Sequence, residues 1–70
     1  MTYIGARIRE ARQRYGMSQA ELARRVKISK TAMNDIEQGQ TTYPRVDIVY
    51  RIARTLHVTM ESFLTEETTP

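Results

Sequence analysis

Four neighbouring side chains in the middle of the chain have the hydrogen-bonding groups best suited to contacting another molecule. They lie on the outward face of a helix predicted over residues 30–38, and they are Lys30, Thr31, Asn34 and Asp35. Lysine can donate to guanine O6 or N7, asparagine can bind adenine through two hydrogen bonds, an acid can accept from cytosine N4, and threonine can offer its methyl or hydroxyl group. The same residues also suit an ordinary solvated helix face, with Asp35 bonded to Thr31 one turn earlier. The surrounding elements must decide between the two interpretations.

Catalytic and metal-binding chemistry lacks the residues that it needs. The chain has no cysteine and a single histidine, His57, so neither a thiolate site nor a pair of imidazoles can form. The sequence contains no Ser/His/Asp or Cys/His set and no glycine-rich phosphate loop. We therefore expect no enzymatic activity, no metal and no cofactor.

Charge is distributed unevenly along the chain. The net charge is +3, but residues 1–60 hold all 11 lysines and arginines against five acids, whereas residues 61–70 hold three acids and no base. The body is therefore +6 and the tail −3. A basic body can bind a phosphate backbone, and it can equally be an arginine-rich solvated surface. Charge alone leaves both interpretations open.

Length and hydropathy limit the architecture and the location. Seventy residues suffice for one domain, and a core of that size is only marginally stable. Without disulfides or metals, the usual supplement is a second subunit. No apolar run approaches the roughly 20 residues of a membrane span, and the N-terminus lacks the apolar block of a signal peptide. The sequence predicts a soluble protein of the cytoplasm with no membrane partner.

Apolar spacing and capping signals predict five short helices and no strand. The helices fall at about residues 3–15, 18–26, 30–38 and 45–56, followed by a short one with Met60, Phe63 and Leu64. Ser18 and Glu21 form a capping-box pattern, in which each side chain bonds the other residue's backbone amide. The fourth helix is expected to bury Val46, and residues 65–70 are expected to fray. The predicted fold class is all-α, with residues 1–70 as one compact five-helix domain.

The stretch from Gln19 to Ile36 has the pattern of two helices that cross steeply around a tight turn. Each helix supplies one inward apolar stripe, and the turn supplies Ile28 as a plug. Ala23 is small where the second helix must approach the first closely. A helix-turn-helix module is built in this way, and its second helix lies in the major groove of DNA.

This stretch, SQAELARRV-KIS-KTAMNDIEQG, resembles the helix-turn-helix of the lambdoid phage repressor and Cro family, also called the Xre family. IREARQRYGMSQAELA resembles the first helix of that family and its join to the second, and PRVDIVYRIARTLHVTMESFL resembles its fourth and fifth helices. The resemblance covers about residues 3–64 and implies a lambda-repressor-like fold. Lys27 and His57 stand where the family commonly has glycine. A non-glycine residue in a left-handed conformation costs about 1 kcal/mol, which a fold can tolerate.

The resemblance implies roles for the residues at matching positions. The residues expected to read base edges are Lys30, Thr31, Asn34 and Asp35. The residues expected to contact phosphates are Gln19, Arg24, Gln38, Thr41 and Arg45. Arg12 and Glu37 are expected to form a structural salt bridge that ties the first helix to the third.

One such module covers few base pairs, whereas two modules related by a two-fold axis read half-sites about one helical turn apart. The expected dimer surface consists of Met60, Phe63, Leu64 and Tyr50, unless these residues close the core instead. The leading hypothesis is a homodimeric, sequence-specific transcriptional regulator, commonly a repressor, that binds an inverted repeat in double-stranded DNA. The alternative is a module of the same fold that binds a protein partner, as an antitoxin subunit does.

Overall fold

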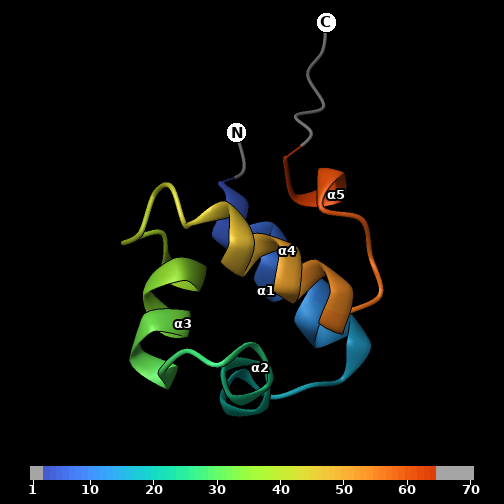
Figure 1. Cartoon of the computed structure of the whole chain (residues 1–70), viewed down its shortest axis with the longest axis horizontal. Coiled ribbons are helices and arrows are strands. Elements are labelled where there is room, and N and C mark those ends of the chain that lie inside the picture. The colour runs from blue at the N-terminus through green and yellow to red at the C-terminus, as the bar shows by residue number, and fades with distance from the viewer. Residues whose placement is uncertain (1–2, 65–70) are drawn as a thin grey trace, which may run out of the picture.

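The computed structural model describes residues 3–64, which form five helices and no strand (Figure 1). The helices are α1 (Ile4–Tyr15), α2 (Gln19–Val26), α3 (Lys30–Gln38), α4 (Val46–Thr55) and α5 (Glu61–Leu64). In Figure 1, α4 lies in front of α1, with α3 on the left, α2 below and α5 at the upper right. α1 packs on α3 and α5, and α2 packs on α3 and α4. The predicted all-α fold of five helices is confirmed; the predicted frayed end at 65–70 lies outside the described residues.

Hydroxyl caps begin three of the helices, and the one at Ser18 is the cap predicted from the sequence. Ser18 Oγ, Ser29 Oγ and Thr59 Oγ1 each accept a hydrogen bond from the amide three residues later, at 3.1, 3.0 and 3.2 Å. The capping box at α2 is only half formed. The Glu21 carboxylate accepts from Arg25 Nη2 at 2.8 Å, because a guanidinium one turn along the exposed surface offers it a charged partner.

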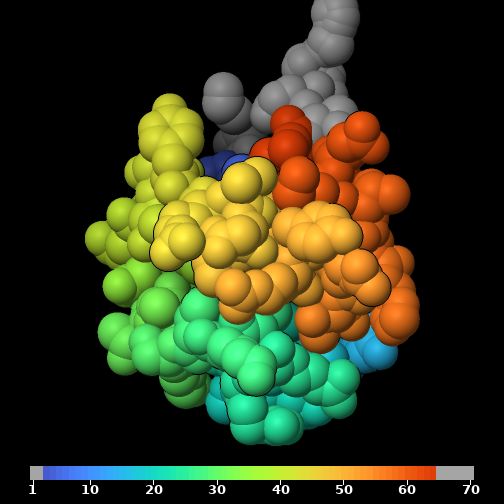
Figure 2. All heavy atoms as spheres, viewed as in Figure 1, coloured from blue at the N-terminus to red at the C-terminus, as the bar shows by residue number. Residues whose placement is uncertain are grey.

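The core collects apolar side chains from all five helices. The most deeply buried of them include Ile8, Leu22, Val26, Met33, Ile52 and Phe63. Ile28 packs against this core from the turn between α2 and α3, as the predicted plug. Figure 2 shows α4 covering the middle of one face, between α3 and α5. The predicted burial of Val46 is wrong: this side chain is 67% exposed, because it is the first residue of α4 and the buried stripe of that helix begins at Val49.

Two non-glycine residues occupy left-handed conformations at helix ends. Lys27 ends α2 with φ 64°, and His57 follows α4 with φ 60°. The imidazole of His57 stacks on the ring of Tyr15, with 5.8 Å between centroids and 15° between planes. This contact joins the end of α4 to the end of α1. Both positions are those at which the resemblance led us to expect glycine.

Two helix backbones approach each other closely at Gly5. A Cβ atom added there would overlap the backbone carbonyl oxygen of Ile36 on α3. Gly5 therefore lets the backbones of α1 and α3 touch, and this contact sets the distance between the two helices.

Candidate DNA interface

A buried ion pair holds α3 against α1. Glu37 is fully buried and accepts two hydrogen bonds from Arg12, Nε to Oε2 at 2.7 Å and Nη2 to Oε1 at 3.0 Å. Arg12 Nη1 also donates to the backbone carbonyl of Met17 at 2.9 Å. Parallel hydrogen bonds between a guanidinium and a carboxylate define both angle and distance. The salt bridge expected from the sequence is thus present, and it joins α1, the loop before α2, and α3.

Gln19 extends this arrangement to the exposed surface. Its Nε2 donates to Glu37 Oε1 at 3.1 Å and lies 3.4 Å from Asn34 Oδ1. The side chain therefore bridges the first turn of α2 and the outer face of α3. Its amide nitrogen is committed to these two acceptors, so a phosphate at this helix N-terminus would meet the backbone amides.

The outer face of α3 presents the residues expected to read bases. Lys30, Thr31 and Asn34 are exposed and together line a shallow pocket. Asp35 is half-buried beside them, and its backbone carbonyl accepts from the Thr41 amide at 3.1 Å. Within residues 3–64 no hydrogen bond joins the Asp35 and Thr31 side chains. Three of the four residues thus share one open polar surface, and Asp35 lies at its margin.

The other residues expected at phosphates are all exposed: Arg24, Gln38, Thr41 and Arg45. Arg24 Nη2 lies 3.8 Å from Glu21 Oε2, and Arg45 Nη2 lies 3.2 Å from Asp47 Oδ2. Surface ion pairs of this kind are typically worth about 0–1 kcal/mol, so both arginines can exchange their partners for a phosphate at little cost.

The residues expected at a dimer surface separate into two groups. Phe63 is 2% exposed and closes the core where α5 packs on α1, and Met60 is half-buried against the same core. Leu64 and Tyr50 are about half exposed, and the Tyr50 hydroxyl accepts from Arg54 Nη1 at 3.1 Å.

Sequence reasoning did not offer Tyr43 and Val46 as interface residues, although they are the most exposed of the large apolar side chains in the described range, at 90% and 67%. Val46 lies one turn before Tyr50 on α4, but it also stands three residues before the buried Val49. Its spacing is therefore that of the core stripe and gave no signal of its exposure.

Other kinds of site find no support in the described part of the chain. Among residues 3–64, no three acidic or histidine side chains come together in a way that could hold a metal ion. Over the same range, no helix is both long and apolar enough to cross a membrane.

Comparison with known proteins agrees with this geometry. The family model described as helix-turn-helix matches residues 8–63, which includes α2, the turn and α3. The chain belongs to the helix-turn-helix family. The same comparison bears out the Xre-type resemblance drawn from the sequence.

Three proteins that are similar to this helix-turn-helix protein are regulators of transcription. An uncharacterized HTH-type transcriptional regulator of Archaeoglobus fulgidus is 38% identical over 55 residues, which cover 79% of this chain and 77% of that protein. The HTH-type transcriptional regulator SinR of Bacillus licheniformis is 30% identical over 64 residues, covering 91% of this chain and 58% of SinR. A crystal structure of SinR, described as the master regulator for biofilm formation, in complex with DNA has a TM-score of 0.84 at 29% identity, covering 89% of this chain and 98% of that one. This protein is thus similar to regulators of transcription, and it spans little more than half the length of SinR.

Proposed function

We infer that this protein is a DNA-binding transcriptional regulator that reads base edges with α3. The observation that carries this inference is the open row of Lys30, Thr31 and Asn34 on a helix whose position is fixed by buried contacts. A side chain discriminates between bases only when its own backbone is held in place, since a misplaced donor loses most of a hydrogen bond. The relatives are regulators of transcription, and one of them is known in complex with DNA.

We propose further that the protein acts as a homodimer on an inverted repeat and represses transcription. One copy of α3 reaches only a few base pairs, and a two-fold axis doubles the number read. The exposed apolar side chains of Tyr50 and Leu64 support a second copy as the partner, since burial between two copies would remove them from water. A transcriptional regulator must reach the DNA that it controls, so we propose a cytoplasmic location. We also propose that the protein has no enzymatic role.

The test is fluorescence anisotropy with a labelled duplex from the upstream region of the gene and a scrambled duplex, at several salt concentrations. We expect the native duplex to bind about a thousandfold more tightly than the scrambled one. Lys30→Ala with Asn34→Ala should remove that preference and leave weak, salt-sensitive binding.

Arg14→Ala is a suitable control, because Arg14 lines a pocket with Leu56 and Val58 on another side of α1. Equal, weak binding of both duplexes that the double variant does not alter would rule out the proposed reading helix. Co-purification of a different protein in stoichiometric amount would instead favour the interaction-module alternative.

A further inference from the structure

The contact line between α1 and α3 has one flank that faces the core and one that faces solvent. On α1, Gly5 and Arg12 meet α3, while Ile8 is buried. Since successive residues are about 100° apart around a helix, Arg9 and Gln13 lie on the flank away from Ile8. These two side chains therefore lie on the solvent side of the contact line.

The same reasoning applies to α3. Glu37 meets Arg12 at the contact line, and Ile36 is turned to the core. Asn34 and Gln38 are exposed and lie on the flank away from Ile36. The solvent flanks of α1 and α3 thus form one continuous surface, which starts at the row expected to read bases and ends at Arg9 and Gln13.

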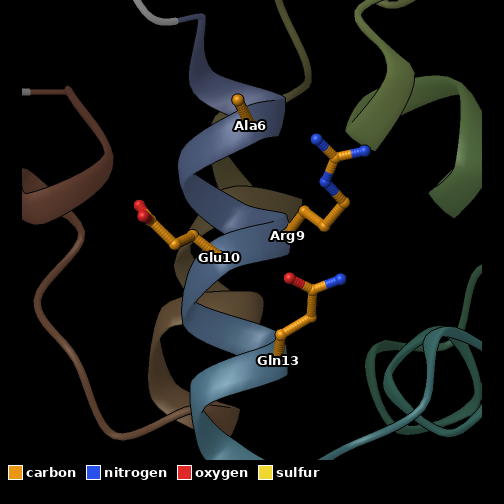
Figure 3. A pocket seen from close by; sticks show the side chains of 4 residues that line it. All are labelled: Ala6, Arg9, Glu10 and Gln13. Carbon is orange, nitrogen blue, oxygen red and sulfur yellow. The ribbon is translucent and has the colours of Figure 1, made fainter.

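Figure 3 shows the side chains on this flank of α1. Arg9 and Gln13 extend toward the side on which α3 and α2 lie, whereas Glu10 points away from them. Together with Ala6 these residues line a shallow pocket. Arg9 forms no ion pair with any residue in the range 3–64. Within this range its guanidinium has no carboxylate partner, and it lies at the edge of the candidate interface.

We propose that Arg9, assisted by the amide of Gln13, binds a backbone phosphate of DNA and extends the interface from the helix-turn-helix onto α1. A guanidinium matches the geometry of a phosphate and can bind it through two hydrogen bonds. A duplex seated on Asn34 and Gln38 continues across the adjoining flank, where the Arg9 side chain stands. Such a contact adds affinity for any sequence and leaves the choice of sequence to α3. The inference rests on the proposed function, because it requires that α3 face the duplex.

The experiment measures the binding of the full chain to the native and scrambled duplexes across a range of salt concentrations. Arg9→Ala should weaken binding to both by a similar factor, about tenfold at low salt, the scale of one charged hydrogen bond. The plot of log K against log salt concentration should become shallower by about one unit for each protomer bound. Arg9→Lys should retain the slope and lose part of the affinity, and Gln13→Ala should have a smaller effect than Arg9→Ala. The matched control is Arg14→Ala, which removes the same charge from the same helix on another side; far-ultraviolet circular dichroism checks that each variant is folded.

Each outcome distinguishes this inference from the proposed function. Identical affinities and salt slopes for Arg9→Ala and Arg14→Ala overturn the contact on α1 while the role of α3 stands. A shallower slope for Arg9→Ala alone supports the contact, even if the wild type binds both duplexes equally and the sequence preference proposed above fails. A wild-type chain that binds neither duplex overturns both proposals.

Discussion

At the scale of single residues, Glu37 on α3 is the side chain that joins three helices. Its carboxylate is fully buried and is contacted by Arg12 from α1 and by Gln19 from α2. An unpaired carboxylate in such a place is costly, whereas a paired one is tolerated because both oxygens accept hydrogen bonds. Removing one member of the pair while the other remains should therefore lower the free energy of unfolding more than removing both.

A double-mutant cycle tests this reasoning. We expect Arg12→Leu and Glu37→Leu to lower the free energy of unfolding by about 3 kcal/mol each, because each leaves a buried charge without its partner. The double variant should lose much less than the sum, because two leucines leave no charge behind. Urea denaturation followed by circular dichroism measures all four proteins. Strictly additive losses would show that the two side chains act independently.

At the scale of elements, the important quantity is the separation of α1 and α3. The backbones meet at Gly5 and Ile36, and about two turns of α1 later the Arg12–Glu37 pair holds the same two helices together. A close backbone contact and a bidentate ion pair, two turns apart on α1, leave α3 little freedom to rotate. The orientation of the outer face of α3 is thus determined from within the core.

Gly5→Ala should separate these helices. The added methyl group would overlap the carbonyl of Ile36, and overpacking typically costs about 1–3 kcal/mol. The higher helix propensity of alanine offsets at most about 1 kcal/mol of this cost. The variant should therefore have a lower melting temperature on thermal denaturation.

Gly5→Ala should also lose preference for the native duplex, because α3 would shift. Gly16→Ala is the control, since nothing lies within 4 Å of a Cβ atom at that position. That variant strains a left-handed backbone with φ 89° but leaves α3 in place. A Gly5→Ala protein that keeps its full duplex preference would contradict the idea that the contact between the backbones orients α3.

At the scale of the whole molecule, the open question is what covers the exposed apolar side chains. Tyr43, Val46, Tyr50 and Leu64 are all exposed, from the loop after α3 to the end of α5. Phe63 is withdrawn into the core and cannot take part in an interface without leaving it. We expect the surface around Tyr50 and Leu64 to be buried by a second copy.

Tyr50→Glu with Leu64→Glu should therefore shift the protein toward the monomer. Charges buried in an apolar interface are strongly unfavourable, so the dimer dissociation constant should rise by at least about tenfold, which corresponds to 1.4 kcal/mol. Sedimentation velocity over a range of concentrations measures the shift, and binding to the inverted repeat should weaken with it. Ser62→Glu, an exposed position on α5, is a control for the added charge. If the variant associates as the wild type does, the second copy binds elsewhere, and Tyr43 and Val46 become the next positions to change.

Two details predicted from local sequence patterns, the burial of Val46 and the complete capping box at Glu21, differ from the structure. Val46 has the spacing of a buried residue, yet no element covers the first turn of α4 on that side. Glu21 has the spacing of a capping box, yet Arg25 competes for its carboxylate. In both cases the local pattern allowed two outcomes, and the neighbours present in the folded chain selected one.

Local sequence patterns were sufficient to predict the five helices, the cap at Ser18 and the family. Those features depend on interactions between residues three or four positions apart, which a linear pattern records directly. Three contacts became visible only in the folded chain: Gln19 binds Glu37 beside Asn34, Gly5 touches Ile36, and Arg9 extends toward the side on which α3 lies. These contacts join residues far apart in the sequence, and they depend on the angles at which the helices cross. Such angles result from the packing of whole surfaces, which no short stretch of sequence contains.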